Sequence, residues 1–87
     1  MSTTTKDDVA VRTEIASALL STAAARAGRT FCPSEVAREL RPEDWRSLMP
    51  LIREEAERLV GKGQLHCWQR GDRASPTAAS GPIRLSS

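Results

Sequence analysis

The residues that could carry covalent chemistry are two cysteines, Cys32 and Cys67, and the single histidine, His66. Cys32 precedes a proline at the expected start of a helix, where the helix dipole can lower a thiol pKa and make the sulfur nucleophilic. Nothing near it in the sequence completes a catalytic set, because one cysteine and one histidine lack an orienting group. We therefore interpret Cys32 as a buried, inert thiol and expect no enzymatic activity.

Metal and phosphate sites have little support either. Cys32, His66 and Cys67 could supply three metal ligands in space, but the chain lacks the paired CxxC spacing of recognisable zinc sites. Gly61 and Gly63 flank Lys62 at the end of an expected helix, the wrong end of the dipole for an anion. The sequence therefore predicts no metal and no cofactor.

Nucleic-acid recognition is a further possibility, and it depends on arginine. Basic residues number 13 against 11 acidic ones, and only Lys6 and Lys62 are lysines. Guanidinium groups bind phosphates and base edges bidentately. The net charge of +2 and the pI near 8.9 are too mildly basic to indicate a nucleic-acid partner by themselves. The alternative explanation for the many arginines is a compositional bias toward arginine and alanine.

Helices must position most of these side chains. A first helix is expected to begin at Thr5, which has capping-box spacing to Asp8, and to end at about Ala27 before Gly28. Its apolar residues recur at helical spacing. The expected buried face comprises Val11, Ile15, Ala18, Leu19 and Thr22.

A second helix follows a short β-prone segment, residues 30–32, in which Phe31 is expected to anchor the core. Proline suits the first helical position, so Pro33 predicts a helix that begins there with Cys32 as its cap. Glu35 lies three residues after the cap, as in a capping box. The helix is expected to end near Leu40, because Pro42 restricts the residue before it.

The third helix is expected to begin at Ser47, as its cap, and to end at Val60 before Gly61. This start puts Pro50 in the first turn, where its missing N–H costs no intrahelical bond. The expected buried residues are Ile52, Ala56, Leu59 and Val60, and the expected solvent-facing ones are Arg53, Glu54, Glu57 and Arg58. Glu54 and Arg58 have the i,i+4 spacing of an ion pair.

Alternation of period two then predicts a strand over residues 64–69, with Leu65 and Cys67 facing the helices. Residues 71–81 have a loop composition, and residues 82–85 predict a returning strand, so the pair forms a hairpin with a long tip. In this register His66, Trp68 and Arg84 share the outer face, where Arg84 could stack on Trp68.

This order of elements predicts a mainly α fold with a small antiparallel β-sheet, a winged helix-turn-helix of three helices and a two- or three-stranded wing. We expect residues 1–5 to be a disordered tail and residues 6–87 to form one domain. The segments CPSEVAREL (32–40), WRSLMPLIREEAERL (45–59) and GPIRL (81–85) resemble a bacterial winged-helix family of unassigned function over residues 13–85. The resemblance implies the fold and supplies no activity or site residues.

In a winged helix bound to duplex DNA, the third helix enters the major groove and the wing contacts the adjacent backbone. The base-side candidates are Arg46, Ser47 and Arg53, and the phosphate-side candidates are Lys62, Arg70, Arg73 and Arg84. Five acidic residues between positions 43 and 62 oppose this role, because phosphate repels them.

A protein-interaction module without DNA binding is the alternative, with His66 and Trp68 as candidate partner-binding residues. No run of residues is apolar enough to span a bilayer and no secretory signal is recognisable, so a cytoplasmic location is expected. The sequence leaves the oligomeric state open.

Overall fold

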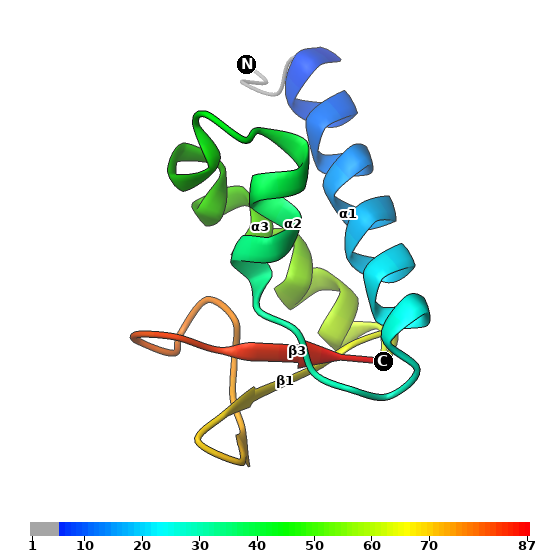
Figure 1. Cartoon of the computed structure of the whole chain (residues 1–87), viewed down its shortest axis with the longest axis vertical. Helices are drawn as coiled ribbons and strands as arrows, with labels where there is room; N and C mark the ends of the chain where they lie inside the picture. Colours follow the sequence, from blue (N-terminus) through cyan, green and yellow to red (C-terminus); the bar gives the residue numbers. More distant parts are fainter. Residues whose placement is uncertain (1–5) are drawn as a thin grey trace.

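The computed structural model describes residues 6–87, so the expected tail of residues 1–5 and the Thr5 cap lie outside it. The elements are α1 (Lys6–Arg26), α2 (Pro33–Leu40), α3 (Trp45–Gly61), β1 (His66–Gln69), β2 (Asp72–Arg73) and β3 (Arg84–Ser86). In Figure 1 the three helices pack together and the sheet lies across one end of them. The expected fold class is confirmed: the described chain is mainly helical with a three-stranded antiparallel sheet, consistent with a winged helix.

The core lies between the helices and the inner face of the sheet. It includes Ile15, Leu19, Phe31, Val36, Ile52, Leu59, Leu65, Cys67, Ile83 and Leu85, each at most 2 % exposed. Phe31 is fully buried, and its backbone exchanges two 2.8 Å hydrogen bonds with that of Leu85. The alternation expected for residues 65–67 is confirmed, and the segment before α2 extends the sheet beyond β3 through Phe31.

The ends of α1 and α2 fall where local signals predicted them. Gly28, just past the end of α1, has a φ of +88°, a left-handed conformation that glycine adopts without steric cost. At the start of α2 the Cys32 N–H donates to the Glu35 carboxylate at 3.0 Å, which confirms the capping role expected of this pair. Arg26 forms an ion pair with Glu35 and so ties the end of α1 to the start of α2.

The expected start of α3, with Ser47 as its cap, is wrong by three residues. The helix begins at Trp45, with Asp44 as its cap, and Pro50 lies inside it. Ser47 is not the cap; its hydroxyl donates instead to the Asp44 carboxylate at 2.6 Å. Pro50 removes the bond that its N–H would make to the carbonyl of Arg46. The three extra helical residues bring Trp45 against the core.

The charged face of α3 also differs from the expectation. Glu55 is 5 % exposed and accepts hydrogen bonds from Arg58, at 3.1 and 3.0 Å, and from Arg12 of α1, at 3.3 Å. The expected Glu54–Arg58 pair is therefore wrong, and Glu54 binds Arg12 instead, at 3.0 Å. A buried carboxylate needs such partners, since isolated charge is costly to remove from water. The network joins α1 to α3.

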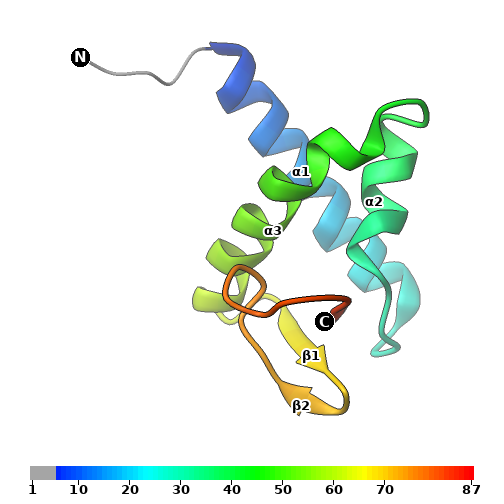
Figure 2. The same ribbon diagram turned by 90° about the vertical axis from the view of Figure 1, so that its left-hand side faces the viewer.

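The sheet has the strand order β2-β1-β3, with both pairs antiparallel. The expected pairing of β1 with a returning strand is confirmed, but residues 71–81 are not all loop, because β2 lies within them. β1 and β2 are joined by Arg70 and Gly71, whose φ values of +53° and +86° are those of a type I′ hairpin turn. Figure 2 shows this short hairpin projecting beyond the helices. The wing is defined here as residues 62–87, which contain all three strands.

Candidate nucleic-acid interface

Charge is distributed unevenly between α3 and the wing. α3 (residues 45–61) contains three arginines and three glutamates, a net charge of 0, and two further acidic residues, Glu43 and Asp44, lie just before it. The wing contains four basic residues, Lys62, Arg70, Arg73 and Arg84, and one acidic residue, Asp72, a net charge of +3. An anionic partner is therefore attracted to the wing more strongly than to α3.

The expected site residues on α3 do not gather in one place. Arg46 and Ser47 are exposed at the N-terminal end, and the Arg46 guanidinium lies 4.5 Å from the centroid of the Trp45 ring. Lys62 caps the other end of the helix. At 1.5 Å rise per residue, Arg46 and Lys62 are separated by about 24 Å along the axis. They cannot belong to one compact patch.

Arg53 was expected to face solvent, and this expectation is wrong. Its side chain is half-buried and donates to three backbone carbonyls in the loop between β2 and β3, residues 74–83. Nη1 lies 3.2 Å from the Pro76 oxygen and 3.0 Å from the Ala79 oxygen, and Nη2 lies 2.6 Å from the Gly81 oxygen. These acceptors are 23 to 28 residues away in sequence. Arg53 fastens the loop to α3 instead of projecting toward a ligand.

Glu57 holds the same loop one helical turn further on. Its carboxylate accepts hydrogen bonds from the hydroxyls of Ser75 and Thr77, the latter at 2.8 Å. These two hydrogen bonds lower the pKa of Glu57 below its ordinary value, because both stabilise the ionised carboxylate. The bond from Ser75 has the larger effect and the bond from Thr77 the next largest. Glu57 was expected to face solvent and is half-buried under the loop. The loop therefore occupies the middle of the helix face that would enter a groove.

On the sheet, Trp68 is half-buried and makes contacts on two sides. Its Nε1 donates to the Ser86 hydroxyl at 3.0 Å, and the Arg73 guanidinium lies 4.7 Å from the ring centroid. The expected stacking of Arg84 on Trp68 is wrong, although the two residues face each other in register. Arg84 donates instead to the hydroxyl and carbonyl of Thr30, each at 3.2 Å. Arg84 thus binds the neighbouring oxygens of Thr30, and Arg73 lies over the indole in its place.

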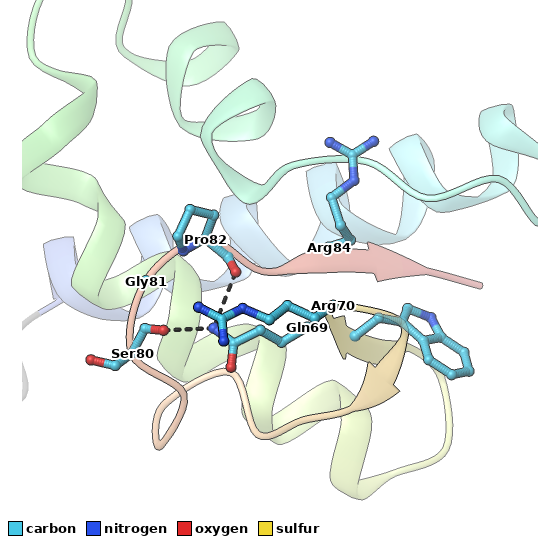
Figure 3. A pocket seen from close by; sticks show the side chains of 7 residues that line it. Gln69, Arg70, Ser80, Gly81, Pro82 and Arg84 are labelled. Carbon is cyan, nitrogen blue, oxygen red and sulfur yellow. Dashed lines mark hydrogen bonds between the residues drawn. The ribbon is translucent and has the colours of Figure 1, made fainter.

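The wing is hollowed beside these residues (Figure 3). The hollow has a volume of about 440 Å³ and is lined by Trp68, Gln69, Arg70, Ser80, Gly81, Pro82 and Arg84. Of the expected site residues, Trp68, Arg70 and Arg84 therefore meet here, with Arg73 against the indole. Sequence reasoning missed the contribution of residues 80–82, because their approach to Gln69 depends on how the loop folds back.

Residues 12–87 match a family described as "Protein of unknown function (DUF3253)". The chain belongs to this family. A search of curated proteins found no match. The resemblance to a family of unassigned function is thus confirmed over the whole of its expected span, residues 13–85, and the bacterial origin stays a prediction.

The thiols of this DUF3253 domain lie in different surroundings. Cys67 is fully buried, and burial raises the pKa of its thiol. The expectation that Cys32 is buried is wrong: it is half-buried at the start of α2, with its sulfur 3.0 Å from the Ser34 hydroxyl. Within residues 6–87, no three His, Cys, Asp or Glu side chains are grouped to hold a metal. None of the helices in this range is long and apolar enough to cross a membrane.

Proposed function

We propose that the DUF3253 domain is a binding module for nucleic acid, with duplex DNA as its simplest ligand, and that the wing makes the principal contacts. The net charge of +3 on the wing carries the proposal. Lys62, Arg70, Arg73 and Arg84 form no ion pair with any side chain that the structure describes. No carboxylate of the described residues lies within ion-pair distance of them, so their charges can attract phosphates, which is the main source of affinity for DNA, although Arg84 also donates to Thr30.

The role of α3 in this proposal is secondary. Arg46 and Ser47 are exposed at its N-terminal end and can approach a phosphate or a base edge. To contact DNA, Arg53 would first have to break its hydrogen bonds to three loop carbonyls. The carboxylates of Glu54 and Glu57 would repel the DNA phosphates. The hairpin of β1 and β2 instead projects from the domain, as strands that contact a backbone or groove do (Figure 2).

Fluorescence anisotropy of a labelled random duplex, measured at several salt concentrations, tests the proposal. We expect binding at low salt with an affinity that falls as salt rises. The informative variant is Arg70→Asn, because asparagine tolerates the left-handed turn position and Asn-Gly favours a type I′ turn. It removes a charge without straining the hairpin. Each lost phosphate contact should reduce the slope of log affinity against log salt by about 0.9.

Arg41→Gln is the matched control. Arg41 is exposed at the end of α2, so this variant makes the same change in net charge away from the wing. We expect its salt slope to equal that of the wild type. Equal slopes for Arg70→Asn and Arg41→Gln would show that net charge, not the wing, controls binding. Absence of binding by the wild type at low salt would reject the proposal.

A protein-interaction module is the second candidate, favoured by the half-buried state of Trp68 and His66 on the outer face of the sheet. The two ring centroids lie 6.2 Å apart, so together they form an aromatic surface. Aromatic side chains of this kind often carry most of the energy of an interface. The titration with labelled duplex also distinguishes the candidates, because a protein-interaction module without DNA binding should bind no duplex even at low salt.

A further inference from the structure

The volume of the hollow in the wing, about 440 Å³, is within the range of small-ligand sites. Its lining comprises the seven residues named above. Two segments form it: the end of β1 with the adjoining turn, and the chain that leads into β3. In Figure 3 Arg70 and Gln69 lie against residues 80–82, while the Arg84 side chain points away from them, toward the segment before α2. The lining of the hollow therefore includes one aromatic side chain, Trp68, and two arginines, Arg70 and Arg84.

The side of the hollow formed by the loop is fixed in position. The Gln69 amide donates to the carbonyls of Ser80, at 2.6 Å, and Pro82, at 3.2 Å. The Gly81 carbonyl between them is held by Arg53, as described above. All three carbonyls thus have donors already. A ligand would meet a rigid wall there, and it would not need to supply donors to that wall.

The groups left for a ligand are mainly donors and the face of the Trp68 ring that Arg73 does not cover. Arg70 makes no ion pair with the described side chains, and none of the residues that line the hollow is acidic. Arg84 uses Nε and Nη2 on Thr30, which leaves Nη1. A guanidinium group suits a phosphate, and an indole ring suits a planar base. Both features occur together in a nucleotide.

We propose that the hollow accepts one unpaired nucleotide, with its phosphate at Arg70 and its base against Trp68. This inference rests on the proposed function and narrows its ligand. Bases inside a duplex are stacked and cannot enter a hollow on a protein surface without leaving the stack. The preferred nucleic acid is therefore a duplex with an adjoining unpaired stretch or end.

Three labelled DNA molecules with the same number of phosphates separate base insertion from electrostatic attraction. One is a blunt duplex, one is a duplex with a short single-stranded overhang, and the third has the same overhang with abasic sites in place of its bases. We expect the wild type to bind the normal overhang at least about fivefold more tightly than the abasic one, as stacking of one base on an aromatic ring would give. Equal affinity for these two would overturn the inference while leaving the proposed function intact.

Variants of Trp68 locate the effect. Trp68→Leu should abolish the preference for the normal overhang, whereas Trp68→Phe, which keeps an aromatic ring, should retain most of it. Circular dichroism checks that both variants are folded, and the comparison of probes on the wild type stands without them. A preference that survives in folded Trp68→Leu would overturn the assignment. If none of the three DNA molecules binds, the proposed function itself fails.

Discussion

Replacement of Arg53 by methionine tests whether α3 and the 74–83 loop are held together as described. Methionine keeps an unbranched stem and a good helix propensity but removes the guanidinium group. The change deletes hydrogen bonds to the carbonyls of Pro76, Ala79 and Gly81. It leaves the sequence of the loop unaltered, so any effect on stability arises from the lost contacts.

The expected loss of stability follows from the number and exposure of these bonds. A hydrogen bond to a charged group contributes roughly 1.5–3 kcal/mol when well shielded. The bond to Gly81 is exposed and the other two are only partly buried, so water can replace part of each. We therefore expect a total of about 2–3 kcal/mol. A domain of this size unfolds with roughly 4–13 kcal/mol, so the loss should be large.

Urea denaturation followed by far-ultraviolet circular dichroism measures the free energy of unfolding. Arg46→Met is the matched control, because Arg46 lies on the same helix, is exposed, and makes no hydrogen bond with a described residue. Its guanidinium lies over the Trp45 ring, an exposed contact, so we expect the variant to lose no more than about 1 kcal/mol. If Arg53→Met unfolds within that same margin of the wild type, the contacts with the loop do not stabilise the domain and our account of the α3 face is wrong.

Three further predictions concern the core and the titratable groups. Phe31→Ala should destabilise the domain by about 3–5 kcal/mol, measured by the same denaturation, because it empties a fully buried site; a loss below about 1 kcal/mol would contradict its role as an anchor. The pKa of Glu57 is lowered in the folded state, so its contribution is present above the ordinary value of 4.5 and is lost as pH falls below it. Glu57→Gln should therefore lose less stability than the wild type between about pH 5 and pH 3, and parallel pH profiles would refute this. With a thiol reagent under native conditions, half-buried Cys32 should react and buried Cys67 should stay protected until the domain unfolds; mass spectrometry of the labelled peptides would reveal the opposite order.

Much of the fold could be predicted because its signals are local. The end of α1 depends on the conformational freedom of Gly28, and the start of α2 depends on Pro33 and on the capping pair of Cys32 and Glu35. The inner face of the sheet follows from alternation around Leu65. Each signal involves residues within about four positions of one another, so their interactions persist whatever the rest of the chain does.

The candidate site was predicted less completely, because its side chains choose partners far along the sequence. Arg53 was expected to face solvent but binds a loop 23 to 28 residues away. Arg84 was expected on Trp68 but binds Thr30, 54 positions earlier, and Arg73 takes its place over the indole. Several acceptors compete for each guanidinium group, and spacing in the sequence does not show which of them lies nearest in the folded domain.

The sequence by itself determined the order of helices and strands, the apolar faces that form the core, and the excess of positive charge in residues 62–87. Only the tertiary structure decided which of those charges remain free. A flexible arginine side chain can satisfy its donors with any carbonyl or carboxylate within reach, and which ones are within reach is fixed by packing. Arg53 was thereby assigned to the loop, and Arg70 was left without an ion pair on the wing.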